Sequence, residues 1–358
     1  MANKLKQLYS LIQTRGIRST LTAFFYLLRQ ELACSTPKKL FNLLKCKIGW
    51  WLRLPRALGL PYSYYIDPIN MCVLNCPLCP TGTGKMQRPR GRMKLEDFKA
   101  IVDEIADVAY IIYLYNWGES FLHPDIMEMI EYSSKKKIIV RISTNLNAFK
   151  PESAPQLIHS GLSQLVVSID GASQETYASY RVGGNLARVT ANIQAIVNAK
   201  RAAGSTHPRI DVRMLVTRHS EHEIEQVREL VKSLGADTFS TGPIYIDPRR
   251  PKDVEQWVPV ESRVSAYESA SDPQNTWKCA DLWQNCTISW DGGVLPCCWL
   301  HNPKDDFGNV LEKPLSEIWN NAFYVNSRRV FSRIKNIRIT GIEKTVCERC
   351  KGHPEYDY

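Results

Sequence analysis

Residues 63–79 read SYYIDPINMCVLNCPLC, an apolar strand-like segment followed at once by three closely spaced cysteines. Five further β-type segments alternate with amphipathic helical ones, and the strands we expect are Ser63–Ile69, Tyr110–Tyr115, Ile138–Thr144, Gln164–Ile169, Arg209–Val216 and Thr238–Ile244. Strands with intervening helices predict an α/β fold with a parallel sheet, here a partial barrel. In such folds reactive residues follow the carboxyl ends of strands, which is where this cysteine cluster lies.

Length and composition restrict the class of protein. The chain has 358 residues, of which 44% are apolar and 23% charged, so we expect two or three globular units rather than a disordered or fibrous protein. No apolar run, Ala23–Leu28 included, approaches the length needed to cross a bilayer, and arginines interrupt any export signal. We therefore expect a cytoplasmic protein whose cysteines are not paired in disulfides.

The net charge of +10 is confined to an N-terminal arm, residues 1–62. The arm contains eleven of the 46 Lys and Arg residues but only one of the 36 Asp and Glu residues. The rest of the chain has 35 residues of each charge and is neutral. Two amphipathic helices are expected, with apolar faces at Ile17, Leu21, Phe24, Phe25, Leu28 and Leu32 and at Leu40, Phe41, Leu44, Ile48, Trp51 and Leu52. Basic helices with Trp and Phe suit the inner face of an anionic membrane. Packing on the body is the alternative, and a nucleic-acid partner is disfavoured because the aromatics lie on the apolar faces.

The cysteines fall into two groups that point to metal or redox chemistry. Cys72, Cys76 and Cys79 lie on one loop, and three thiolates suit a [4Fe–4S] cube with one iron left open, whereas structural zinc takes four ligands. The second group, from Cys279 to Cys350, falls within the last 80 residues. The sequence therefore favours at least one iron–sulfur cluster.

The spacing Cys-x3-Cys-x2-Cys after a first strand resembles the radical S-adenosylmethionine (SAM) superfamily, which folds as a partial (β/α)6 barrel. Trp117-Gly118-Glu119 is similar to the Gly-Gly-Glu motif of the family, with Trp117 in place of the first glycine. The resemblance implies that SAM is bound by residues at successive strand ends, namely Gly118, Glu119, Ser143, Asn145, Ser168, Asp170, Arg181 and Val216.

The C-terminal stretch, residues 251–358, resembles the SPASM and twitch domains that follow radical SAM barrels, residues 63–250 here. The resemblance implies that one auxiliary [4Fe–4S] cluster is held by Cys279, Cys297, Cys347 and Cys350. No cysteine follows Cys350, which favours the one-cluster twitch form, and a structural zinc site is the alternative. Cys286 and Cys298 remain as structural thiols or as hydrogen-atom donors, and Cys286 also as an alternative ligand.

The implied reaction is reductive cleavage of SAM to a 5′-deoxyadenosyl radical, which abstracts hydrogen from an unactivated C–H bond. A fully ligated second cluster suits electron transfer, so we expect an oxidoreductase that dehydrogenates a sugar, a cyclitol or a membrane-associated small molecule. The implied partners are SAM, this substrate and an external reductant such as flavodoxin or ferredoxin. Modification of a ribosomally made peptide and epimerisation with a cysteine hydrogen donor remain open. So does a non-enzymatic electron-transfer module, although such a module needs no SAM-binding residues.

Overall fold

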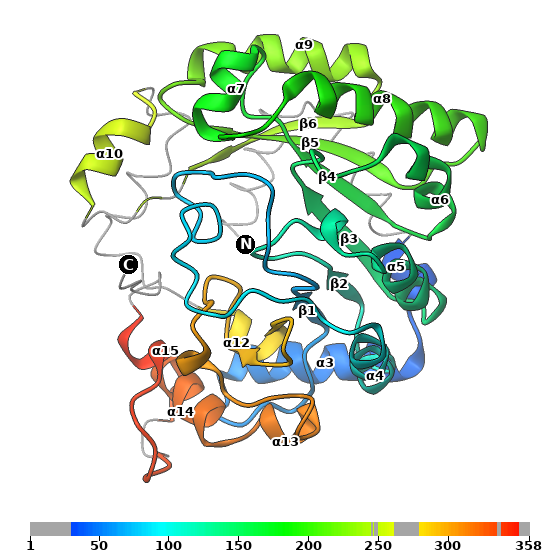
Figure 1. Ribbon diagram of the computed structural model, residues 1–358. Coiled ribbons are helices and arrows are strands. Elements are labelled where there is room, and N and C mark those ends of the chain that lie inside the picture. The colour runs from blue at the N-terminus through cyan, green and yellow to red at the C-terminus, as the bar shows by residue number, and fades with distance from the viewer. Residues whose placement is uncertain (1–29, 245, 247–249, 261–278, 335–337, 351–358) are drawn as a thin grey trace. The chain divides into compact units, whose positions relative to one another are not determined.

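The computed structural model describes residues 30–244, 246, 250–260, 279–334 and 338–350 (Figure 1). The chain divides into two compact units. The first contains Val73–Gly82 and the described part of residues 142–275, and the second contains Cys34–Cys72, Thr83–Arg141 and the described part of residues 276–350. The predicted segment boundaries after residues 62 and 250 stay predictions.

The first unit has a three-stranded parallel sheet. Strand β5 (Arg209–Val216) lies between β4 (Gln164–Ser168) and β6 (Thr238–Pro243), and apolar side chains such as Val167 and Val212 are fully buried. Its helical elements are η2 (Pro151–Ser153), α6 (Ala154–His159), α7 (Gln174–Tyr180), α8 (Leu186–Ala202), η3 (Glu221–Glu223), α9 (Ile224–Leu234) and α10 (Pro251–Trp257), and Figure 1 shows α8 and α9 beside the sheet.

The second unit is built around β1 (Ser63–Ile66), which has a parallel neighbour on each side. One neighbour is β2 (Ile111–Tyr113), which pairs in turn with the first residues of β3 (Ile139–Thr144). The other neighbour is β7 (Asn285–Ile288), which forms an antiparallel pair with β8 (Val294–Leu295). The loop that follows β1 therefore begins in the middle of a sheet.

Helices of the second unit come from both ends of the chain. They are α3 (Pro37–Leu52), α4 (Leu95–Ile105), η1 (Ser120–Leu122), α5 (Ile126–Lys135), α12 (Asp281–Gln284), η5 (Pro303–Asp305), α13 (Leu315–Ile318), α14 (Ala322–Phe331) and α15 (Val346–Arg349). Helix α3 packs against α12, so the N-terminal arm and the C-terminal stretch meet in one core.

The predicted α/β class with a parallel sheet is confirmed. All six expected strands are present, although most are shorter than expected, because residues such as Asp67–Ile69 already belong to the loops that carry function. Strand β7 was not expected. Its sequence, Asn-Cys-Thr-Ile, is polar and short, and it becomes a strand by pairing with β1.

Helix α3 occurs where the second arm helix was expected. Thr36 caps its first turn by accepting from the backbone N–H of Lys39, and Arg53 ends it in the left-handed conformation. The apolar side chains of the expected face are exposed, while Lys39, Asn42, Cys46 and Gly49 are buried. Helix α3 therefore packs on the body through its polar side, and not through the apolar face expected from the sequence. The first apolar face, from Ile17 to Leu28, lies outside the described residues.

Candidate active site

The three-cysteine loop leaves β1 and passes from the second unit into the first. Cys76 is buried, Cys72 and Cys79 are half-buried, and the backbone N–H of Cys79 donates to the carbonyl oxygen of Cys76 at 3.1 Å. Gly82 lies against this turn so closely that a Cβ there would come within 2.5 Å of the backbone nitrogen of Cys76. The local fold therefore requires glycine where the loop returns past its central thiol.

In the first unit, an ion pair holds an arginine beside Cys76. The Nε of Arg181 donates to Oδ2 of Asp170 at 2.5 Å, and its Nη1 lies 3.9 Å from the Cys76 sulfur. The other oxygen of Asp170 accepts from the backbone N–H of Leu215 at 2.7 Å. Both carboxylate oxygens are thus occupied within the protein. Asp170 therefore orients Arg181, and the guanidinium of Arg181 is the group available to bind an anion.

The surroundings of Cys76 also affect its ionisation. Burial raises the pKa of the Cys76 thiol, and the charge of Arg181 opposes this effect. A thiolate that binds a metal must lose its proton, so a cation at 3.9 Å helps this cysteine to act as a ligand.

Three other predicted SAM contacts lie at strand ends of the first unit, and a fourth just after β3. Ser143 and Ser168 are half-buried near the ends of β3 and β4, and Val216 is fully buried at the end of β5. Asn145 is buried, and its Oδ1 accepts from the backbone N–H of Asn147 at 2.9 Å. These positions fit the predicted order along the sheet, and their contacts with SAM stay predictions.

In the second unit, the Trp117-Gly118-Glu119 segment is held against the chain just before Cys72. A Cβ on Gly118 would stand 1.7 Å from the carbonyl oxygen of Ile69, so only glycine fits here. The backbone N–H of Glu119 donates to Met71 at 2.8 Å, and its buried carboxylate accepts from Phe121. Gly118 and Glu119 thus lie beside the first residues of the cysteine loop, and their contacts with SAM stay predictions.

Two partners of this segment could not be read from the sequence. The buried carboxyl of Asp67 accepts from the backbone N–H groups of Trp117 and Gly118, and burial raises its pKa to about 7 despite these bonds. The indole Nε1 of Trp117 donates to the carbonyl oxygen of Leu300 at 3.0 Å. Trp117 replaces a glycine of the family motif. Its hydrogen bond connects the motif to the C-terminal stretch.

The C-terminal stretch brings four cysteines together from three separate segments. Burial raises the pKa of the Cys347 thiol, and the nearby Cys279 and Cys350 raise it further. Burial likewise raises the pKa of Cys297, and Cys347 raises it further. These four cysteines are half-buried, and four soft sulfur donors suit an iron–sulfur cluster. Among the described residues, no three His, Cys, Asp or Glu side chains converge tightly enough to bind a single ion.

The two remaining cysteines lie in different surroundings. Cys286 is fully buried on β7, is hydrogen-bonded to the Tyr324 hydroxyl and has a pKa raised to about 12 by burial. Cys298 follows the ligand candidate Cys297, and burial followed by Cys298 raises the pKa of Tyr65. Cys298 thus lies close enough to Tyr65 of β1 to influence its ionisation, whereas Cys286 lies in the core. Their proposed role as hydrogen donors stays a prediction.

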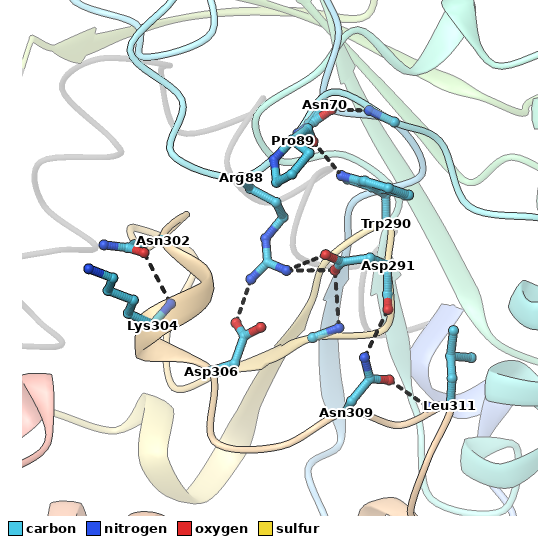
Figure 2. Close-up of polar contacts among 12 residues, drawn as sticks. Asn70, Arg88, Pro89, Trp290, Asp291, Asn302, Lys304, Asp306, Asn309 and Leu311 are labelled. Carbon is cyan, nitrogen blue, oxygen red and sulfur yellow. Dashed lines mark hydrogen bonds and ion pairs between the residues drawn. The ribbon is translucent and has the colours of Figure 1, made fainter. Parts of the chain in front are cut away.

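An ion-pair cluster links the loop after the cysteines to the C-terminal stretch. The buried Arg88 donates from Nη1 to both oxygens of Asp291 at 2.6 Å, and from Nη2 to Asp306 at 2.5 Å (Figure 2). Next to it, the indole of Trp290 donates to the carbonyl oxygen of Pro89 at 3.1 Å (Figure 2). In the sequence Arg88 is a single charged residue with no partner nearby, because both of its partners lie more than 200 residues away. Its ion pairs could therefore not be predicted.

A group of tyrosines on β1 and after β2 was also missed. Tyr65 stacks on Tyr113 with ring centroids 4.5 Å apart, and Tyr115 meets both rings edge-on. Arg141 lies with its guanidinium 5.7 Å from the Tyr113 ring centroid. Within the described part of the chain, this guanidinium pairs with no carboxylate and its Nε has no hydrogen-bond acceptor. The sequence did carry one signal: side chains two residues apart on a strand share a face, so Tyr113 with Tyr115 and Arg141 with Ser143 were expected to point the same way.

Comparison with known proteins agrees with this arrangement. Residues 66–231 match the radical SAM superfamily, and residues 279–351 match SPASM, an iron–sulfur cluster-binding domain. A relative of the chain is the AdoMet-dependent heme synthase of Methanosarcina barkeri, 25% identical over 78% of this chain and 88% of that protein. Another is the mycofactocin maturase MftC of Mycobacterium ulcerans, 29% identical over 46% of this chain and 42% of that protein.

Solved structures give the same fold. The crystal structure of Streptococcus suis SuiB bound to S-adenosylmethionine is 16% identical and has a TM-score of 0.61, covering 80% of this chain and 71% of that chain. SuiB bound to its precursor peptide SuiA gives a TM-score of 0.58 at 17% identity and covers 93% of this chain and 83% of that chain. The cofactors of such domains are SAM and [4Fe–4S] clusters, and this chain contains a radical SAM domain over residues 66–231 followed by a SPASM iron–sulfur domain over residues 279–351.

Proposed function

We propose that this protein is a radical SAM oxidoreductase that removes a hydrogen atom from an unactivated C–H bond and then takes up one further electron from the substrate. The observation that carries the proposal is the separation of its cysteines into two sets. Three cysteines share a loop with an oriented arginine, and four others gather in the C-terminal stretch. Three ligands leave one iron of a cube open, whereas four leave none.

The residues present fit both cofactors. Cys72, Cys76 and Cys79 would hold the first cluster, and Cys279, Cys297, Cys347 and Cys350 the second. When bound together, the first cluster and SAM supply one-electron cleavage of the sulfonium to methionine and a carbon radical that abstracts hydrogen. The electron for this cleavage would come from an external reductant such as flavodoxin or ferredoxin.

The task of the protein itself is to position SAM and to exclude water. Arg181 is fixed by Asp170 and would bind the carboxylate of SAM, because a guanidinium held at a fixed angle pairs well with a carboxylate. Gly118 permits close approach of its backbone, and Asp67 fixes that backbone through two N–H groups. Such pre-orientation keeps the reacting C–H bond at the required distance.

Oxidation follows from electron counting. Loss of a hydrogen atom, then of one electron and one proton, oxidises the substrate by two electrons. A fully ligated auxiliary cluster would supply the acceptor for that electron, and the proton would pass to solvent.

The substrate expected from the sequence, a sugar or cyclitol, gains no support from the relatives. Peptide modification is the second candidate, because relatives include maturases and the similar SuiB structure was solved with a precursor peptide. The guanidinium of Arg141 donates from Nη1 to the Tyr113 hydroxyl but, among the described residues, pairs with no carboxylate, which supports a substrate with an acidic group such as a peptide can supply. Among such reactions, an epimerisation would use Cys298 or Cys286 to return hydrogen.

The decisive experiment is anaerobic reconstitution with iron and sulfide, followed by SAM and dithionite. We expect 5′-deoxyadenosine and about eight irons per chain, as two cubes require. Replacing Cys72, Cys76 and Cys79 together with Ala should abolish 5′-deoxyadenosine and leave about four irons. Intact clusters without 5′-deoxyadenosine in the unsubstituted protein would instead support the electron-transfer module.

A second variant separates oxidation from epimerisation. Cys347→Ala should keep hydrogen abstraction, seen as deuterium passing from labelled substrate into 5′-deoxyadenosine, while oxidised product falls. Circular dichroism must accompany the assay, because cluster binding and folding are linked in small cysteine sites. If a folded Cys347→Ala protein lacking the second cluster forms product at the native rate, the electron-acceptor role is wrong. Deuterium from solvent at the product carbon would then indicate epimerisation.

A further inference from the structure

Helix α3 presents a continuous apolar stripe to solvent. Its apolar residues recur at intervals of three and four and therefore lie on one side of the helix. They are Leu40, Phe41, Leu44, Ile48, Trp51 and Leu52. Their exposed fractions are large, reaching 61% for Phe41, 55% for Leu44 and 73% for Trp51. Single exposed apolar residues are ordinary, but a contiguous stripe of this kind marks a binding surface.

The stripe cannot turn inward without breaking the contacts that fix the opposite side of α3. The Nδ2 of Asn42 donates to the carbonyl oxygen of Leu60 at 2.8 Å, and the N–H of Leu60 donates back to Asn42 at 3.0 Å. Lys39 is buried and donates from Nζ to the carbonyl oxygen of Lys137 at 2.6 Å. The helix is therefore held by its polar side, with its apolar side directed outward.

The surroundings of the stripe are positively charged. Between Leu32 and Ile66 the chain has six Lys and Arg residues and no acidic residue. On α3 itself, the ammonium of Lys45 lies over the Phe41 ring, 4.4 Å from its centroid. Lys38 is exposed at the start of the helix, where it pairs with the equally exposed Asp107. An occupant of this surface has to accept both apolar side chains and lysines.

We propose that α3 docks on an anionic lipid bilayer, with Phe41, Leu44, Ile48 and Trp51 inserted at the boundary of headgroups and acyl chains. Lysine is depleted in protein–protein interfaces, whereas lysines beside Trp and Phe favour anionic headgroups. No helix in the described parts of the chain is long and apolar enough to cross the bilayer, so the contact would be peripheral. This proposal does not depend on the proposed reaction.

The test uses the full chain and flotation with vesicles. Phosphatidylcholine vesicles containing phosphatidylglycerol should bind the protein, pure phosphatidylcholine vesicles should bind it far less, and added salt should release it. The double variant Phe41→Ser/Trp51→Ser should lower binding by at least about tenfold, because two large side chains no longer enter the apolar layer. Leu311→Ser, at a side chain 45% exposed on the C-terminal stretch, is the matched control and should bind as the unsubstituted protein does.

Other occupants of the stripe give other results, and each overturns the proposal. A dimer that the double variant converts to monomer, without vesicle binding, would assign the stripe to a second copy. A large loss of unfolding stability in the double variant, absent in Leu311→Ser, would mean that another part of the chain covers it. Equal flotation of the double variant and the unsubstituted protein, or no flotation of either, would exclude the bilayer.

Discussion

Helices α3 and α4 are both amphipathic and lie in the same unit, but they use their apolar sides in opposite ways. Helix α4 buries Phe98, Ile101, Val102 and Ile105 almost completely. Helix α3 exposes its apolar stripe and buries Lys39, Asn42, Cys46 and Gly49. Periodicity alone identifies a face of a helix, and the comparison shows that it does not say whether protein or another partner covers that face.

The largest effect is expected on α4. Phe98→Ala should lower the free energy of unfolding by about 3–5 kcal/mol, because Phe98 is fully buried and its removal leaves a cavity. Urea unfolding followed by circular dichroism measures this change. Glu96→Ala, at an exposed position of the same helix, is the control and should shift the midpoint little. A loss below about 1 kcal/mol for Phe98→Ala would mean that α4 is not core.

On α3, the largest effect should come from a polar residue. Asn42→Ala removes the acceptor of the Leu60 N–H and leaves the Leu60 carbonyl oxygen with the Cys46 thiol as its remaining donor, so we expect a loss of about 1–3 kcal/mol. The same urea titration tests it. If Asn42→Ala did not change the free energy of unfolding, α3 would not be held to the core by its polar side, and the described orientation would be wrong.

The buried Lys39 should make stability depend on pH. Burial lowers the pKa of Lys39 from its usual 10.5, although Cys34 and Asp107 oppose this shift. The folded state thus binds this proton less tightly than the unfolded state, so stability should rise as pH increases from the lowered pKa to 10.5. Lys39→Met should remove this rise, whereas Lys38→Met, at an exposed neighbour, should keep it. A rise of equal size in Lys39→Met would assign it to another group.

The smallest effect is expected for the exposed stripe. Leu44→Ala should change the free energy of unfolding by no more than about 0.5 kcal/mol, since Leu44 is mostly exposed already. Thermal unfolding without lipid is the measurement. A loss close to that of Phe98→Ala would show that protein covers the stripe, and the contrast between the two helices would disappear.

Much of the fold could be predicted because its signals are local. The six strands follow from short apolar segments between helical ones, and the cysteine loop lies directly after the first of them. The place of Gly118 and Glu119 beside Met71 agrees with the order of strand ends. Such features depend on residues that are near in sequence or on the regular geometry of a parallel sheet.

The remaining features depend on contacts between distant residues. Arg88 meets Asp291 and Asp306, Trp117 meets Leu300, and β7 becomes a strand only beside β1. No periodicity reports such pairs. On α3 the apolar face followed from periodicity, but the core partners of Lys39 and Asn42 on its other side did not.

The pairing of β1 with β7 has a consequence for synthesis. The two strands are about 220 residues apart, so at about 5–20 residues per second β1 waits roughly ten to fifty seconds for β7 to leave the ribosome. During that interval one edge of β1 is unpaired, and such edges invite association between chains. The loop with three free thiols begins at the same strand. Yield of intact protein should therefore depend on translation speed and on temperature during expression, before any iron is loaded.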